Sequence, residues 1–260
     1  MTEKIDNWLL GPITQCVLYL GDEMVYSGLL RRGLITMTGM HPFFALADRH
    51  LEMAGADTVP LKRMAREYLS WEDKAKEHIG NGFSTVHRHS LVGLWCAVET
   101  AIEDSIILIL ERSPQAEELL RNAGYRVKTS PLSSLNEEQL RRVYSNLERQ
   151  ARDRGNVAEA WIDLLSALDV KFSLSAQNIS AIAEANEVRN CILHRGGEID
   201  EQAASKSPGL RPIVGQRIDV DEKRYFGYYD ALGAFATAMI NGVTASCHCK
   251  WQKPGGQPCV

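Results

Sequence analysis

An arginine and a histidine, Arg189 and His194, lie five residues apart near the end of a predicted helix. A guanidinium stays charged at neutral pH and can hold a phosphate group through two parallel hydrogen bonds. An imidazole can take up or release a proton near neutral pH. Side chains of these two types can therefore cleave a phosphodiester without the help of a metal ion.

The residues around this pair add polar groups on one helix face. Asn190 directly follows the arginine, and Asn186, Asn190 and His194 are spaced four residues apart. On a helix this spacing places the three polar side chains on the same side. Gly196-Gly197 follow the histidine and predict the end of the helix.

The pattern Arg-Asn-x-x-x-His, followed by two glycines and an acidic residue, resembles the signature of the HEPN superfamily. Members of this superfamily are small α-helical domains, and many are ribonucleases that need no metal ion. The resemblance extends from about Val86 to Val243. It includes the helix Leu91–Leu110 with Glu99, the motif helix, and a short excursion around Gly209–Val220 before a last helix.

The resemblance implies a mechanism for the motif residues. His194 would deprotonate the ribose 2′-hydroxyl or protonate the leaving 5′-oxygen, and Arg189 would stabilise the charge of the transition state. Asn190 would orient the histidine or the phosphate, with Asn186 as a supporting residue. The product would carry a 2′,3′-cyclic phosphate, no cofactor would be needed, and RNA but not DNA would be cut.

The resemblance also implies partners. Arg189 and His194 lie about 140° apart on an ideal helix, so one chain would not easily aim both at one atom. HEPN domains commonly dimerise with two motif helices facing each other, and a two-fold axis then places both pairs in one cleft. We therefore expect a homodimer that acts on RNA, as a toxin or antiviral defence effector with an antitoxin or regulatory protein as its partner.

Other interpretations of the same residues stay open. Arg189 could be a structural arginine bonded to a carboxylate, and His194 a helix-terminal histidine stabilised by the macrodipole. The domain would then be a non-catalytic module that binds nucleotide or RNA, or only dimerises. Toxins silenced by adenylylation carry a tyrosine two residues after the motif histidine, where this chain has Gly196, so that form of control is not expected.

Three further side chains are candidates to support the motif. Glu99 lies in an apolar helix, where it either pairs with Arg189 and fixes its direction or stays solvated on the polar side of the helix. Arg195, directly after the motif histidine, and Arg88, in a short basic cluster before the helix of Glu99, are candidates to contact RNA phosphates.

The C-terminal cysteines form a cluster that weakly resembles a zinc site. Cys247, Cys249 and Cys259, with His248 between the first two, supply residue types that can bind zinc. The alternative is a flexible tail without metal, and we expect no metal at the motif itself.

Composition limits the class of protein. The chain of 260 residues has 45% apolar residues, a net charge of -4 and an isoelectric point of about 6.0. This acidity argues against a protein that coats nucleic acid regardless of sequence, although a local basic cleft stays possible. No run of 18 uncharged apolar residues predicts a membrane span, and the first residues lack a signal-peptide pattern. We expect a cytoplasmic protein without a membrane partner.

The hydrophobic periodicity predicts an all-α protein. Three parts are expected: a mainly helical extension (1–85), a HEPN-like domain (86–243) and the cysteine-containing tail (244–260). The domain should be an up-and-down four-helix bundle with a short β-hairpin or extended loop before its last helix. Its helices are expected near 86–111, 137–168, 175–195 and 224–243. Within the extension, residues 1–40 stay open between helix and strand, and Gly11-Pro12 is expected to be a break.

Overall fold

The structure, a computed structural model, describes residues 8–128 and 131–248. Every regular element in these residues is a helix, and a single antiparallel bridge joins Glu198 to Arg217. The all-α prediction is therefore confirmed for the described part of the chain. None of its helices combines the length and the apolar character needed to span a bilayer.

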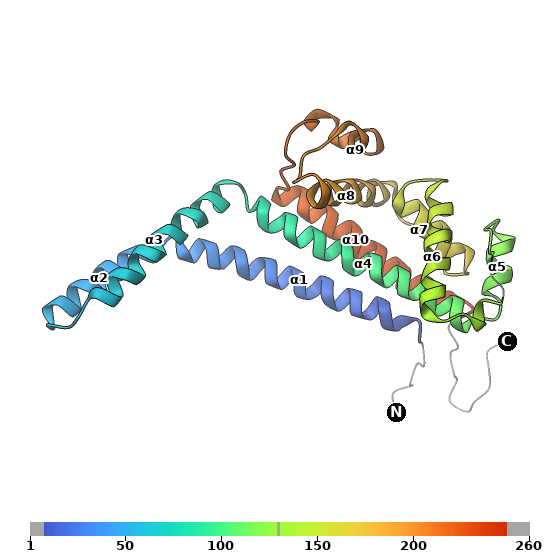
Figure 1. Cartoon of the computed structure of the whole chain (residues 1–260), viewed down its shortest axis with the longest axis horizontal. Helices are drawn as coiled ribbons and strands as arrows, with labels where there is room; N and C mark the ends of the chain where they lie inside the picture. Colours follow the sequence, from blue (N-terminus) through green and yellow to red (C-terminus); the bar gives the residue numbers. More distant parts are fainter. Residues whose placement is uncertain (1–7, 129–130, 249–260) are drawn as a thin grey trace, which may run out of the picture. The chain divides into compact units, whose positions relative to one another are not determined.

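Figure 1 traces the helices along the chain. Two short 3₁₀ helices, Leu132–Ser134 and Pro208–Ile213, interrupt the connections. The α-helices are α1 (Leu10–Met37), α2 (His41–Met53), α3 (Val59–Gly80), α4 (Ser84–Arg112), α5 (Ala116–Asn122), α6 (Glu137–Arg152), α7 (Val157–Ala167), α8 (Ala176–His194), α9 (Glu201–Lys206) and α10 (Glu222–Ala245).

The chain divides into two compact units. Unit 1 contains Leu91–Ile218 together with a segment that ends at Gly21 and another that begins at Gly227; unit 2 contains Asp22–Ser90 and Asp219–Phe226. This division differs from the expected extension over residues 1–85, because α1 contributes to both units. The first half of α1 belongs to unit 1 and buries three apolar side chains, Ile13, Cys16 and Leu20, directly after the buried Leu9.

Unit 1 is organised around buried aromatic rings. Trp161 of α7 lies 5.1 Å from Trp95 of α4 and 5.7 Å from Phe235 of α10, measured between ring centroids. All three side chains are fully buried. Rings at these distances and tilts add specific packing energy to the burial of their surface. The cluster fixes α4, α7 and α10 against one another.

Local capping sets where the site-bearing helices begin. Asn156 closes a capping box with Glu159 at the start of α7, and its Oδ1 also accepts from the Ala158 N–H. Ser175 accepts a hydrogen bond from the Asn178 N–H and starts α8. Such caps satisfy backbone donors that the first helical turn leaves free.

Glycines end α8 as the sequence predicts. Gly196 and Gly197 have φ angles of 61° and 91°, which favour glycine, and the Gly197 N–H donates to the Cys191 carbonyl at 2.9 Å. The following excursion forms α9 and a 3₁₀ helix. Of the two forms expected before α10, a hairpin is not found, because the single bridge at Glu198 and Arg217 does not extend into paired strands.

Helix α1 resolves the open assignment of the described N-terminal residues. Residues 10–37 form one helix, and Gly11-Pro12 lie in its first turn rather than at a break. Proline is tolerated there because the first N–H groups of a helix have no intrahelical acceptor. In unit 2, His87 is fully buried and stacks on Tyr225 at 4.7 Å between ring centroids.

Candidate functional site

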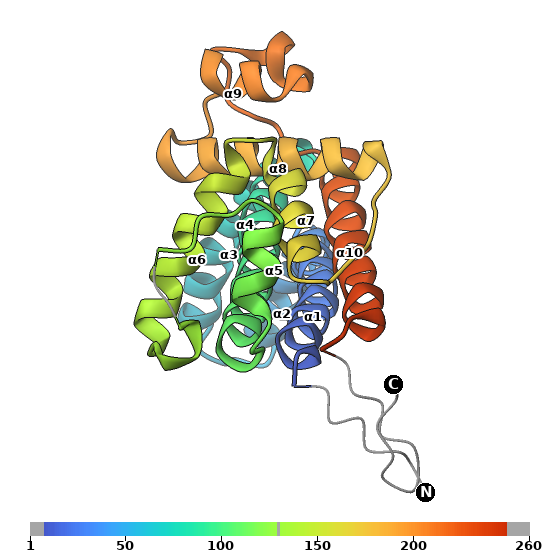
Figure 2. The ribbon, with the colours of Figure 1, turned by 90° about the vertical axis from the view of Figure 1, so that its right-hand side faces the viewer.

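Helix α8 carries the motif on the flank of the unit 1 core. Figure 2 shows α8 running across the direction of α6, α7 and α10, with α9 on its outer side. Its inward face is buried through Ile182, Ala185, Val188 and Cys191. The polar residues beside that face therefore lie where the core meets solvent.

Arg189 is held by two partners. Its Nη2 lies 3.2 Å from Glu99 Oε2 on α4, and its Nη1 donates to Asn190 Oδ1 at 3.0 Å. Its side chain is only 19% exposed, and its buried Nε has no hydrogen-bond partner in the described residues. Of the two alternatives for Glu99, pairing with Arg189 is the one present in the structure.

His194 is the last residue of α8 and is exposed. The described part of the chain offers it no hydrogen bond, and none joins it to Arg189. Arg195 is also exposed, but its guanidinium already pairs with Asp200 Oδ2 at 2.8 Å. Within one chain, then, Arg189 is held by its partners and partly buried, whereas His194 is exposed.

Asn186 and Glu187 form a buried polar pair at the middle of α8. Asn186 Nδ2 donates to Glu187 Oε1 at 2.8 Å, and both residues are buried. Lys206 of α9 adds a cation, with its Nζ 3.6 Å from the same carboxylate oxygen. Buried acids are stable when charges and donors compensate them, and Glu187 has both.

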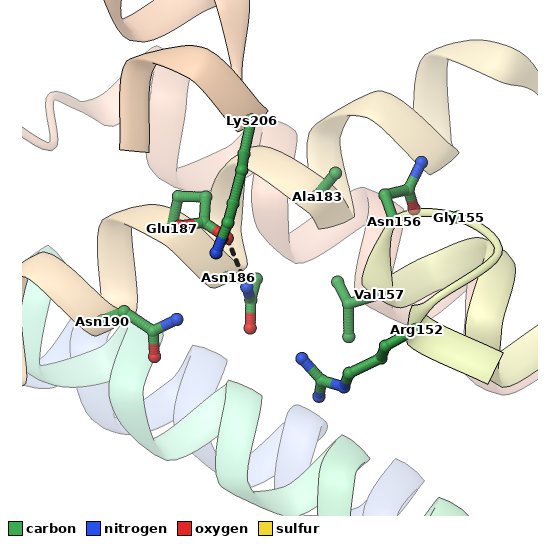
Figure 3. Close-up of a pocket in the computed structure, with 9 residues that line it drawn as sticks. All are labelled: Arg152, Gly155, Asn156, Val157, Ala183, Asn186, Glu187, Asn190 and Lys206. Atoms are coloured by element: carbon green, nitrogen blue, oxygen red, sulfur yellow. Dashed lines mark hydrogen bonds and ion pairs between the residues drawn. The ribbon is translucent and has the colours of Figure 1, made fainter. Parts of the chain in front are cut away.

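A pocket of about 440 Å³ opens along the Asn186 and Asn190 face of α8. Figure 3 shows the ends of Arg152, Asn186, Asn190 and Lys206 directed into this space from α6, α8 and α9. It is lined by Arg152, Gly155, Asn156, Val157, Ala183, Asn186, Glu187, Asn190 and Lys206. Two cations, one acid and three amides thus surround one small volume.

Of the polar residues that line the pocket, the sequence singled out only Asn186 and Asn190, and it missed four: Arg152, Asn156, Glu187 and Lys206. Arg152 ends α6 and pairs with Glu148 at 2.7 Å, so its sequence context indicates only an ordinary helix-surface ion pair. Asn156 lies inside the single helix expected near 137–168, whereas the structure divides that segment into α6 and α7 and places Asn156 at the start of α7. Nothing in the spacing of Lys206 points to α8.

The remaining predicted residues lie elsewhere. Arg88 belongs to unit 2, is half-buried, and is not among the residues that line the pocket of unit 1. Burial, with a hydrogen bond to Asp169 as a second cause, raises the pKa of the Cys247 thiol to about 11. Cys249 and Cys259 lie outside the described residues. No cluster of three or more residues suited to bind a metal occurs in residues 8–128 and 131–248.

Comparisons of the chain with models of protein families, with curated proteins and with solved structures found no match.

Proposed function

We propose that the chain is a metal-independent endoribonuclease of the HEPN type. The observation that carries the proposal is that Arg189 is oriented by Glu99 and Asn190 on α8, while His194 lies exposed one turn after Asn190 on the same helix. A role in toxin–antitoxin or antiviral defence, with an antitoxin or regulatory partner, rests on the motif resemblance alone.

In the proposed reaction the substrate supplies its own nucleophile. His194 accepts the proton of the ribose 2′-hydroxyl, the 2′-oxygen forms a bond to phosphorus, and the bond from phosphorus to the 5′-oxygen breaks. The departing 5′-oxygen takes up a proton, which leaves a 2′,3′-cyclic phosphate and a 5′-hydroxyl. Arg189 stabilises the negative charge on the phosphate oxygens during this step.

The proposal includes a homodimer through α8. Arg189 is fixed by Glu99 and Asn190, so it cannot swing freely round the helix toward His194 of its own chain. A second copy related by a two-fold axis would bring each His194 toward the other chain's arginine. Leu193, 49% exposed beside the histidine, offers apolar surface for such a contact.

A non-catalytic module that binds nucleotide or RNA is the second candidate. The polar pocket on the same helix face favours this second candidate, because a pocket can hold a ligand without a general base such as His194. The pairing of Arg189 with Glu99 is compatible with both candidates, since a structural arginine would pair in the same way. Cleavage, rather than binding, therefore separates the two.

The test is incubation of the full-length protein with labelled RNA in EDTA, with His194→Ala as the variant and His89→Ala, another exposed histidine, as the matched control. Loss of a general acid–base group should lower the rate by about 10²–10⁴. Wild type and the control should both give 2′,3′-cyclic phosphate ends. Equal rates in His194→Ala and wild type, or cleavage that appears only with magnesium, would favour the binding module.

A further inference from the structure

The pocket on α8 presents unused hydrogen-bonding groups of both kinds. Asn190 Oδ1 accepts from Arg189, so its Nδ2 remains available as a donor. Asn186 Nδ2 donates to Glu187, so its Oδ1 remains available as an acceptor. Asn156 Oδ1 accepts from the first backbone N–H groups of α7, which leaves its Nδ2 as a second amide donor. The edge of a nucleobase carries donors and acceptors side by side and is the natural complement of such a set.

Two cations of the pocket keep donors that a phosphate oxygen can use. Arg152 and Lys206 contribute two positive charges, and each is paired with one acid, Glu148 and Glu187 respectively. Glu187 is already approached by Asn186 and Lys206 and is mostly shielded, with a side chain 10% exposed. Arg152 uses Nε and Nη2 for Glu148, which leaves Nη1 for another acceptor. Arg152 Nη1 and the ammonium group of Lys206 are thus the donors that a phosphate would meet in the pocket.

Size and position agree with a nucleotide. A volume of about 440 Å³ lies in the range of small-molecule sites, roughly 300–1,000 Å³. Val157 and Ala183 add an apolar part on which the face of a base can rest. Asn190 joins the pocket directly to Arg189, and His194 follows one turn later on the same helix face.

From these observations we infer that the pocket binds one nucleotide of an RNA chain next to the phosphate that is cut. Asn186 and Asn190 contact the edge of the base, and Arg152 and Lys206 contact its phosphate. This inference rests on the proposed function for the identity of the neighbouring phosphate. The same pocket chemistry would also accept a free nucleotide, and the experiment separates the two sources.

The experiment measures binding of the full-length protein to an RNA oligonucleotide with 2′-O-methyl riboses, which cannot be cleaved. Arg152→Gln and Lys206→Gln should each weaken binding on the order of tenfold, the loss expected for one charge-assisted hydrogen bond. Arg149→Gln removes an exposed charge from the same helix as Arg152, outside the pocket, and should leave binding unchanged. Thermal unfolding of each variant establishes that it is folded.

Two further probes test base recognition and the source of the nucleotide. The same oligonucleotide with abasic positions should bind more weakly to wild type, and Lys206→Gln should still lower its affinity. Equal binding of the abasic chain would overturn base recognition. If the four nucleoside 3′-monophosphates bind as tightly as the oligonucleotide, with the same response to Lys206→Gln, the ligand is a free nucleotide and the inference about RNA is wrong.

The proposed cleavage by His194 and the proposed binding in the pocket can be refuted independently of each other. His194→Ala should lose cleavage but keep the affinity for 2′-O-methyl RNA. Binding that depends on Lys206 in a protein without any nuclease activity would support the pocket and refute the ribonuclease. Active wild type with unchanged affinity in both pocket variants would refute the pocket and leave the ribonuclease standing.

Discussion

Unit 1 and unit 2 place their apolar side chains differently. Unit 1 buries tryptophan and phenylalanine rings at its centre, whereas α2 of unit 2 has no buried residue and α3 buries only Glu72 and Ala75. Large apolar side chains of unit 2 are exposed instead: Val25, Tyr26, Leu29, Leu30, Ile35, Phe43, Leu46, Leu51, Met53, Val59, Met64, Leu69 and Trp71.

This difference indicates where a precise site can be built. The groups around the α8 pocket stand on helices fixed by a packed core, so their geometry is set before a ligand arrives. Exposed apolar surface on the scale seen in unit 2 usually marks an interaction surface. The chain thus combines a unit with a packed core and a unit whose helices α2 and α3 are little buried.

The largest expected effect is on the core of unit 1. Trp161→Ala should lower the free energy of unfolding by about 3–5 kcal/mol, because it removes a fully buried ring that contacts Trp95 and Phe235. Trp71→Ala, at a 52% exposed tryptophan of unit 2, should change it by less than about 0.5 kcal/mol. Urea unfolding of both variants measures the contrast, and a large loss in Trp71→Ala would show that unit 2 is packed more tightly than described.

The second prediction decides which unit carries a dimer interface. Leu193→Glu should weaken a dimer formed through α8 by roughly a hundredfold, because a charge would be placed in the contact. Trp71→Glu, in unit 2, should leave that dimer intact. Sedimentation over a range of concentrations measures both. Dissociation caused by Trp71→Glu alone would move the interface to unit 2, and a wild-type monomer of 29.0 kDa would remove the composite site altogether.

A third, smaller effect compares an ion pair in each unit. Glu99→Gln should lower the free energy of unfolding by about 1 kcal/mol, because Arg189 is largely shielded and keeps only a neutral partner. It should also slow RNA cleavage, since the arginine would be less well oriented. Glu52→Gln, whose partner Lys62 lies 2.7 Å away on an exposed surface, should have no measurable effect on stability.

Glu103→Gln provides a control for the third prediction on the same helix as Glu99. Glu103 pairs with Arg141 at 2.6 Å, one turn along α4, and does not touch the motif. It should leave cleavage unchanged. An equal loss of activity in both variants would mean that Glu99 acts through the stability of α4 and not through Arg189.

Periodic patterns and caps explain how much of the fold was predictable. Helix α8 was placed from its polar face and its terminal glycines, and α4 from its buried positions Leu91, Trp95 and Val98. The first 40 residues gave no clear period, because α1 exposes large apolar side chains such as Leu18 and Val25 that a core-facing stripe would bury.

The pocket marks the limit of inference from the sequence. The pairing of Glu99 with Arg189 could be anticipated, because an acid in an apolar helix needs a partner. The contributions of Arg152 and Lys206 could not, because they depend on where α6 ends and on a six-residue helix, α9, which was not predicted. Such placement is decided by tertiary packing and not by local spacing.

The smallest predicted effect lies in unit 2 and depends on pH. His87 Nδ1 donates to the Val220 carbonyl at 2.9 Å, and its buried Nε2 has no hydrogen-bond partner among the described residues. Burial lowers the pKa of His87 below its ordinary value of 6.5, and Arg31 lowers it further, against the opposing influence of the Val220 carbonyl, Glu222 and Asp221. The histidine is therefore neutral in the folded protein at a pH where the unfolded chain already binds a proton.

The sign of the pH effect follows from this difference in proton binding. Above pH 6.5 the imidazole is neutral in both states and adds no pH dependence. As the pH falls through that value, only the unfolded chain gains a proton, so the free energy of unfolding falls by at most about 1.4 kcal/mol per pH unit until the folded-state pKa is reached.

Urea unfolding at pH 8 and pH 5.5 measures this pH dependence. In His87→Asn the difference in the free energy of unfolding between the two pH values should be smaller than in wild type, even though the loss of the stacked ring destabilises the variant at both. His89→Asn, at an exposed position two residues later, should keep the wild-type slope. Parallel slopes for wild type and His87→Asn would show that the buried histidine is not the group that titrates.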